Sequence, residues 1–145
     1  MYARVRQFSF HRATSIEQAT GLLALGNVKL LAGGTDLVIA MRDDAIQPDV
    51  VVDVNRIPEL RAVSQENGRI TIGAAVTFGE IATQPMLLAQ VPFLPQAASQ
   101  VGSPQIRGAG TVGGNIASGS PAADCVVPLV ALDADVLLAS KAGQR

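Results

Sequence analysis

The sequence predicts an α+β fold arranged as two small lobes. The first observation is an apolar run at residues 28–32 that ends in two glycines, with a helical pattern after it and a second β-branched run at residues 48–54. This order describes a strand–helix–strand unit. The second observation is the dipeptide Asn67-Gly68, a hairpin signal, followed by several short helical patterns. The chain therefore combines a small parallel unit with a separate hairpin and helices.

The first predicted lobe begins with a helix at residues 15–25. Ser15 is a suitable N-cap, and the apolar residues after it share one helical face. The apolar, partly β-branched residues 28–32 then read as a buried strand. The run at residues 48–54 reads as a second one.

The turn between these strands is the first candidate site. Gly33 and Gly34 supply backbone freedom, and Thr35 or Asp36 can cap a helix over residues 37–42. A strand, a glycine turn and a helix start can aim free backbone N–H groups at an anion. An ordinary strand-to-helix turn accounts for the same pattern equally well.

We expect the lobe boundary at residues 57 and 58, giving lobes 1–57 and 58–145. Residues 55–60 read as a turn, because Pro58 does not let a strand continue. The hairpin that follows has predicted strands at 60–65 and 69–76.

The second predicted lobe then becomes helical. Thr77 and Glu80 have the spacing of a capping box for the helix "FGEIAT". Further helical segments are expected through Ala89 and from Phe93 to Val101. Both signals place short helices directly after the hairpin.

Residues 102–121 form a long stretch rich in glycine and serine. Within it, "GAGTVG" at 108–113 matches the dinucleotide-binding pattern, but no buried strand precedes it and no long helix follows, so we reject that match. The stretch reads as a loop that exposes N–H donors and lets a ligand approach, or as a flexible surface loop. Its interleaved apolar side chains favour the first interpretation.

The end of the chain predicts a last helix and a last strand. Ser120 and Pro121 read as the N-cap and first residue of the helix "AADCVVPLVAL", which Pro128 should kink or end. Residues 134–140 then read as a strand.

Composition excludes several functions. The net charge of −1 argues against an electrostatic nucleic-acid binder. One cysteine allows no internal disulfide or cysteine-rich cluster, and His11 is the one histidine, so no metal site is expected. We see no secretory signal and no apolar stretch long enough to span a membrane, so a cytoplasmic location is expected.

Four segments together resemble the FAD-binding subunit of the molybdenum hydroxylases, the medium subunits of the xanthine dehydrogenase and carbon monoxide dehydrogenase type. They are "LLAGGTDL" (30–37), "VVDVNRIPELR" (51–61), "ITIGAAVTFGEI" (70–81) and "QIRGAGTVGGNIASGSPAADCVVPLVALDADVLL" (105–138). The order A-G-G-T-D, then T-V-G-G-N, then S-P-x-x-D is much more specific than either glycine pair alone. The resemblance covers nearly the whole chain.

This resemblance implies a two-lobed FAD-binding domain of the vanillyl-alcohol oxidase and p-cresol methylhydroxylase type. It implies a role as an FAD-dependent oxidoreductase component that takes electrons from iron–sulfur clusters and passes them to NAD or another acceptor. The implied partners are a molybdenum-cofactor large subunit and a small subunit with 2Fe–2S clusters. The redox chemistry belongs to the cofactor, so no catalytic side chain is expected.

The resemblance also implies the residues that contact FAD. Residues 30–37 would wrap the diphosphate, and residues 111–115 would form a second loop. Asp124 would bind a sugar-chain hydroxyl, and position 101 would lie near the flavin. These residues are Leu30, Leu31, Ala32, Gly33, Gly34, Thr35, Asp36, Leu37, Val101, Thr111, Val112, Gly113, Gly114, Asn115 and Asp124.

Several of these residues have simpler interpretations. Asp36 and Asp124 both suit the start of a helix, and Asn115 suits a turn. Arg107 could offset phosphate charge or be a solvated loop residue. Cys125 reads as a small buried apolar group.

The chain departs from the family pattern in two ways. Some bacterial relatives carry a cysteine-rich iron–sulfur insertion after the second glycine segment, and this chain has only Cys125 there. Family members also continue beyond the final "SKAGQR", so we expect a second lobe that is incomplete and a truncated chain. A non-catalytic fragment and a stand-alone flavin oxidase of the same fold are the alternatives.

Overall fold

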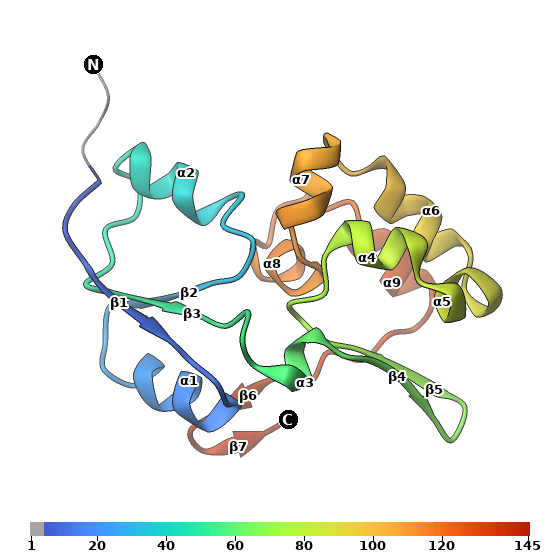
Figure 1. The fold of residues 1–145 in the computed structure, drawn as a ribbon, viewed down its shortest axis with the longest axis horizontal. Helices are drawn as coiled ribbons and strands as arrows, with labels where there is room; N and C mark the ends of the chain where they lie inside the picture. Colours follow the sequence, from blue (N-terminus) through green and yellow to red (C-terminus); the bar gives the residue numbers. More distant parts are fainter. Residues whose placement is uncertain (1–4) are drawn as a thin grey trace.

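A three-stranded parallel sheet organises the N-terminal part of the protein, seen in a computed structural model that describes residues 5–145. Its strands are β1 (Ser9–Arg12), β2 (Val28–Leu31) and β3 (Val50–Asp53), in the order β1-β3-β2. Helices α1 (Ile16–Leu23) and α2 (Leu37–Arg42) lie on opposite sides of this sheet (Figure 1).

The central strand β3 is buried on both faces. Val52 belongs to the apolar cluster with Ala19 of α1, whereas Val51 faces Leu37 and Met41 of α2 across an apolar cavity. A continuous β-branched run is typical of a parallel strand that helices cover on both sides. The sequence "VVVD" therefore forms the middle of the sheet.

The C-terminal part is a hairpin followed by short helices. The hairpin pairs β4 (Val63–Glu66) with β5 (Arg69–Ile72), and positive φ angles of 49° at Asn67 and 76° at Gly68 form its turn. The helices are α3 (Pro58–Arg61), α4 (Phe78–Thr83), α5 (Pro85–Gln90), α6 (Phe93–Gln100), α7 (Pro104–Ala109), α8 (Val112–Ala117) and α9 (Val126–Ala131). A short pair, β6 (Ala139–Ser140) and β7 (Gly143–Gln144), ends the chain.

A second apolar cluster holds these helices together. Ile81 of α4, Leu87 of α5 and Leu94 of α6 are its most buried large side chains, each at most 1% exposed. Val112 of α8 and Cys125 also belong to it. The glycine-rich region is therefore attached to a packed core.

The α+β content and most predicted elements are confirmed. Ser15 caps α1 by accepting a hydrogen bond from the Gln18 N–H at 3.1 Å. Thr77 and Glu80 form the predicted capping box at α4. These local signals were correct because each depends on residues within one turn of one another.

Strand β1 and helix α3 are missing from the sequence prediction. All four side chains of β1 are exposed, so this edge strand lacks the alternation that would reveal it. Residues 55–60, expected to be a turn, include the start of α3, because Pro58 is well suited to the first helical position.

The prediction of a loop over residues 102–121 is wrong for much of its length. Helix α7 begins after Ser103, whose side chain accepts from the Ile106 N–H, and α8 begins after Thr111. Gly113 lies inside α8, where a β-carbon would meet the Ala74 side chain at 2.5 Å. Glycine there allows close helix packing instead of loop flexibility.

The last predicted helix starts later and the last predicted strand is mostly absent. Ser120 accepts from the Ala122 N–H within a turn, and α9 begins only at Val126. Pro128 neither kinks nor ends α9, because the first turn of a helix has no acceptor for the missing N–H. Of residues 134–140, only Ala139–Ser140 form a strand, since β-propensity needs a partner strand.

We predict that Thr77→Ala lowers the free energy of unfolding by about 1 kcal/mol, because it removes the α4 capping box. Thr83→Ala is the matched control, since the Thr83 hydroxyl donates mainly to the Gly79 carbonyl of its own helix. That variant should change stability by less than about 0.5 kcal/mol. Urea unfolding measures both, and equal losses would contradict the capping argument.

Candidate site at the two glycine segments

The two glycine segments predicted from the sequence meet in the structure. A β-carbon on Gly33 would lie 1.9 Å from the Ala109 carbonyl oxygen and 3.0 Å from the Gly110 Cα. Figure 1 shows the β2–α2 connection reaching the region of α7 and α8. Only glycine permits this backbone contact. The segment 30–37 and the segment 111–115 are therefore neighbours at one place on the molecule.

The first segment carries an array of free backbone donors. Within the described part of the chain, the N–H groups of residues 33–37 donate no backbone hydrogen bond. The first hydrogen bond into α2 is donated by the Val38 N–H to the Gly34 carbonyl oxygen at 3.0 Å. Residues 31–35 are half-buried. An array of N–H groups on a turn that leads into a helix favours an anion.

The side chains around this array are small, apolar or anionic. Leu30 is 43% exposed, whereas Leu31, Ala32 and Leu37 are half-buried. Asp36 occupies the N-cap position of α2 without a side-chain hydrogen bond, so the predicted cap by its carboxylate is wrong. That carboxylate is exposed and can accept a hydrogen bond from a hydroxyl.

The second segment uses its N–H groups internally. The Val112 N–H donates to the Val76 oxygen at 3.0 Å, and the Gly113 N–H donates to the Ala74 oxygen at 2.9 Å. The N–H groups of Gly114 and Asn115 donate to the hydroxyl and the carbonyl oxygen of Thr111, respectively. Thr111 caps α8 and is 3% exposed. The expectation that this segment offers free donors is therefore wrong for residues 112–115.

Asp124 is brought to the second segment by one hydrogen bond. The side-chain oxygen of Asn115 accepts from the Cys125 N–H at 3.2 Å, which holds the turn before α9 against α8. Asp124 is exposed, and among the described residues its carboxylate has no hydrogen-bond or ionic partner. Because α9 begins at Val126, Asp124 lies before the helix and not in its first turn.

Two other predicted residues have structural roles. Val101 is 6% exposed and packs in the second cluster, so its side chain offers little surface to a ligand. Arg107 donates to the carbonyl oxygens of Val101 at 3.0 Å and Gly102 at 2.9 Å. Its guanidinium therefore fixes the turn after α6, which neither sequence interpretation of Arg107 had foreseen.

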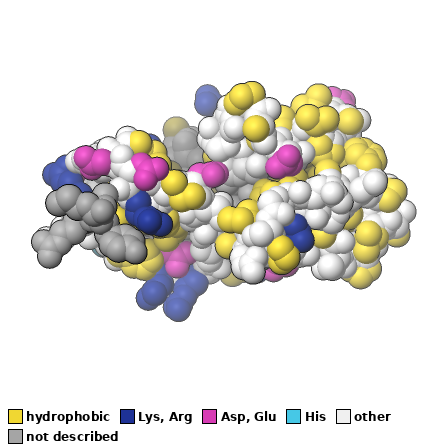
Figure 2. Space-filling model, turned by 90° about the horizontal axis from the view of Figure 1, so that it is seen from above, with side chains coloured by type: hydrophobic (Ala, Val, Ile, Leu, Met, Phe, Trp, Pro, Cys, Tyr) yellow, Lys and Arg dark blue, Asp and Glu magenta, His cyan; other side chains and the backbone are white. Residues whose placement is uncertain are grey.

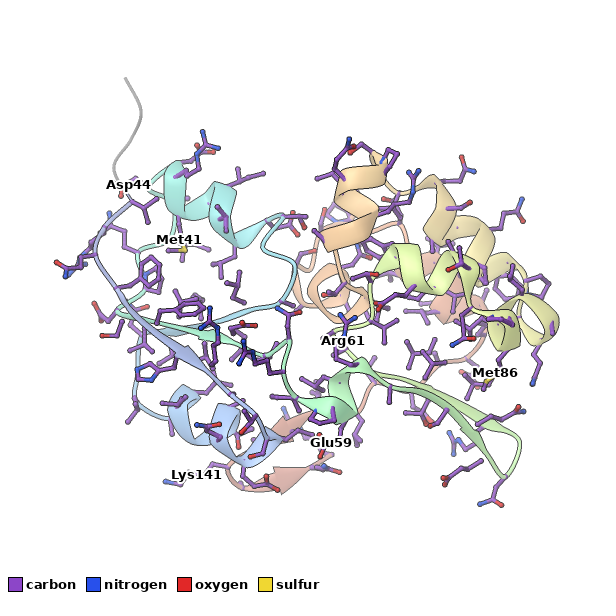
Figure 3. The ribbon with its side chains drawn as sticks, viewed as in Figure 1. Met41, Asp44, Glu59, Arg61, Met86 and Lys141 are labelled. Carbon is purple, nitrogen blue, oxygen red and sulfur yellow. The ribbon has the colours of Figure 1, made fainter. Side chains whose placement is uncertain are left out.

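An apolar cavity of about 300 Å³ lies beside the donor array, between α2 and the sheet. Figure 3 shows Met41 pointing from α2 toward the strands, and this side chain is 7% exposed. The lining residues are Val5, Phe8, Phe10, Leu31, Leu37, Val38, Met41 and Val51. Leu31 and Leu37 flank the free amides, so the cavity adjoins the site.

The described residues hold no group of three or more His, Cys, Asp or Glu side chains that could bind a metal. No helix between residues 5 and 145 is long and apolar enough to cross a membrane. On the face shown in Figure 2, acidic and basic side chains are interspersed instead of gathered by sign. The free amides and exposed carboxylates thus suit a phosphorylated ligand with hydroxyl groups.

Comparison with known proteins identifies the family. Residues 6–145 match the family described as the FAD binding domain in molybdopterin dehydrogenase, and the chain belongs to it. The sequence is 43% identical to the nicotinate dehydrogenase FAD-subunit of Eubacterium barkeri over 97% of this chain and 49% of that protein. It is 38% identical to the carbon monoxide dehydrogenase medium chain of Hydrogenophaga pseudoflava over 96% of this chain and 49% of that one.

Solved structures agree with this assignment. Carbon monoxide dehydrogenase from Hydrogenophaga pseudoflava matches with a TM-score of 0.95 at 37% identity, over 98% of this chain and 50% of that one. Quinoline 2-oxidoreductase from Pseudomonas putida 86 matches with a TM-score of 0.94 at 29% identity, over the same shares. The chain spans about half the length of these relatives. The family resemblance seen in the sequence and FAD as the cofactor of this family are confirmed.

We predict that the Cys125 thiol resists modification in the folded protein. Burial, and next the charge of Asp124, raises its pKa to about 11, so the thiol stays protonated well above neutral pH. A colorimetric thiol reagent at pH 8 should react with it only after urea unfolding. In the folded state, reaction should accelerate as the pH approaches that value. Rapid stoichiometric reaction of the folded chain at pH 8 would contradict this burial.

Proposed function

We propose that this chain is the FAD-binding part of the electron-transfer subunit of a molybdenum hydroxylase. The observation that carries the proposal is the array of unbonded N–H groups at residues 33–37, on a turn that contacts the segment leading into α8. A diphosphate needs several donors close together, and exposed carboxylates suit sugar hydroxyls. The family to which the chain belongs is named for FAD.

The proposed fold is a two-lobed FAD-binding domain of the vanillyl-alcohol oxidase type, with lobes 1–57 and 58–145. The parallel sheet ends at Asp53 and the hairpin starts at Val63, so no sheet crosses the proposed boundary. Each side also has its own buried apolar cluster. The donor array lies on the first lobe and Asp124 on the second, so the ligand would bind between them.

Each part of the site has a defined task in this proposal. The N–H groups of residues 33–37 bind the diphosphate, and the small residues beside them let it approach. Asp124 accepts a hydrogen bond from a hydroxyl of the sugar chain, and Asn115 keeps the turn of Asp124 in place. The proposed FAD site comprises residues 30–37, 111–115 and Asp124, and Val101 contributes at most a small part of its surface.

Bound FAD would supply the hydride and single-electron chemistry that side chains lack. We propose that the electrons come from the iron–sulfur clusters of a small subunit, fed by a molybdenum-containing large subunit, and leave to NAD or another acceptor. The comparisons support this because the relatives include a carbon monoxide dehydrogenase medium chain and a putative xanthine dehydrogenase FAD-binding subunit. This chain's residues bind and orient the cofactor.

The choice of test residue follows from what surrounds each glycine. A β-carbon on Gly113 would strike Ala74, and Gly34 has a φ of +72°. Valine at either position would damage the fold, so neither variant would report on ligand binding alone. Gly114 differs, because a β-carbon there meets only the Thr111 hydroxyl, at 3.0 Å.

We predict that Gly114→Val abolishes FAD binding, because its methyl groups would occupy the space proposed for the ligand. The tight contact with Thr111 should lower the free energy of unfolding without unfolding the protein. Gly108→Val is the matched control, since a β-carbon there has no neighbour within 4 Å and lies outside the proposed site. Flavin absorbance after purification and FAD titration measure both variants. Undiminished flavin content in Gly114→Val would reject this position as part of the site.

We predict that Asp124→Ala weakens FAD binding by about 1.5–3 kcal/mol, the range for a hydrogen bond to a charged group. Asp124→Asn keeps the size and one acceptor, so its loss should be smaller. Titration of FAD-free protein gives the dissociation constants. If both variants bind FAD as tightly as the original protein, Asp124 does not contact the ligand.

A further inference from the structure

The side chain of Asn55, which lies outside the proposed site, holds the peptide between Ala32 and Gly33 at the start of the glycine turn. Asn55, in the segment after β3, donates from Nδ2 to the Ala32 carbonyl oxygen at 2.9 Å and to Oδ1 of Asp53 at 2.8 Å. Its own N–H donates to the same Asp53 oxygen at 2.9 Å. Asn55 is half-buried. It therefore connects the end of β3 to the residue that precedes Gly33.

The orientation of the Asn55 amide is determined by its neighbours. Both partners of Nδ2 are acceptors, a carbonyl and a carboxylate, so only the NH₂ end can face them. The Asp53 carboxylate is itself placed by Arg12, whose Nε lies 3.7 Å from Oδ2. The donor thus points at Ala32 from a fixed position.

Holding the Ala32 carbonyl also fixes the Gly33 N–H. The carbonyl and this N–H belong to one planar trans peptide, in which they point in opposite directions. The last sheet hydrogen bond in this region runs from the Val54 N–H to the Leu31 oxygen at 3.0 Å. Among the described residues, only Asn55 bonds the Ala32 oxygen. Two glycines follow, and glycine offers little resistance to rotation of a peptide unit.

We infer that Asn55 is a positioning residue for the diphosphate-binding turn, which orients the first of the free N–H groups by clamping the preceding carbonyl. This inference rests on the proposed function. Asn55 makes no contact with the ligand in this role. Its effect on binding runs through the Ala32–Gly33 peptide alone, so it concerns ligands that carry a diphosphate.

The chain offers a matched control for this inference. Asn27 also bridges the β2 and β3 regions, donating from Nδ2 to the Gln47 oxygen at 2.8 Å and to the Asp49 carboxylate at 3.3 Å. It does so at the opposite end of the strands from the glycine turn. Asn27→Ala and Asn55→Ala each remove two side-chain hydrogen bonds of one asparagine, but only Asn55→Ala frees the donor array.

The experiment measures FAD, ADP and riboflavin binding to the purified protein by titration, together with urea unfolding. Asn55→Ala should weaken FAD and ADP binding about tenfold, the effect of about one net hydrogen bond, and leave riboflavin binding unchanged. Asn27→Ala should lose similar stability without losing affinity for FAD or ADP. Asn55→Asp cannot donate and would set its carboxylate against that of Asp53, so it should weaken FAD and ADP binding at least as much as Asn55→Ala.

The outcomes separate this inference from the proposed function. If the original protein binds neither FAD nor ADP, the proposed function fails, and the inference fails with it. If the original protein binds both and Asn55→Ala binds them equally well, the inference alone is overturned. It is also overturned if riboflavin binding falls as much as ADP binding, because the role would then be general stability.

Discussion

The backbone contact between Gly33 and the end of α7 is the constraint on which the site depends. One segment follows a strand of the parallel sheet and the other joins two helices, and no side chain separates them at this point. The contact brings a turn with unbonded N–H groups next to a capped helix whose N–H groups are already bonded. It therefore sets the two sides of the proposed ligand site against each other before any ligand binds.

The two sides contribute different properties. The turn after β2 offers donors, while α8 and the turn before α9 offer small residues and the Asp124 carboxylate. The second side is rigid because α8 is capped by Thr111 and tied to the next turn through Asn115. The first side depends on the sheet and on Asn55. In the proposed site, phosphate recognition and hydroxyl recognition therefore belong to separate parts of the chain.

The sequence was sufficient where structure depends on neighbouring residues. The cap at Ser15, the Asn67-Gly68 turn and the Thr77–Glu80 box are local, and so is the glycine turn at residues 33 and 34. The sequence was insufficient where the structure depends on contacts between segments far apart in the chain. Edge strand β1 and the bond from Asn55 to Ala32 depend on contacts between segments far apart, for which no local pattern exists. The assignment of the site residues to FAD remains a proposal.

The glycines of the two segments have a consequence for how such chains are recognised. Gly33 makes room for Ala109, Gly110 for the Phe78 ring, and Gly113 for Ala74. These three glycines are needed because neighbouring protein atoms occupy the space that a side chain would fill. A related chain that had lost its flavin would therefore still need them in order to fold. A motif search built on these glycines consequently detects the architecture, whereas in the proposed site Gly114 and Asp124 are the positions expected to distinguish a flavin-binding chain from a descendant without flavin.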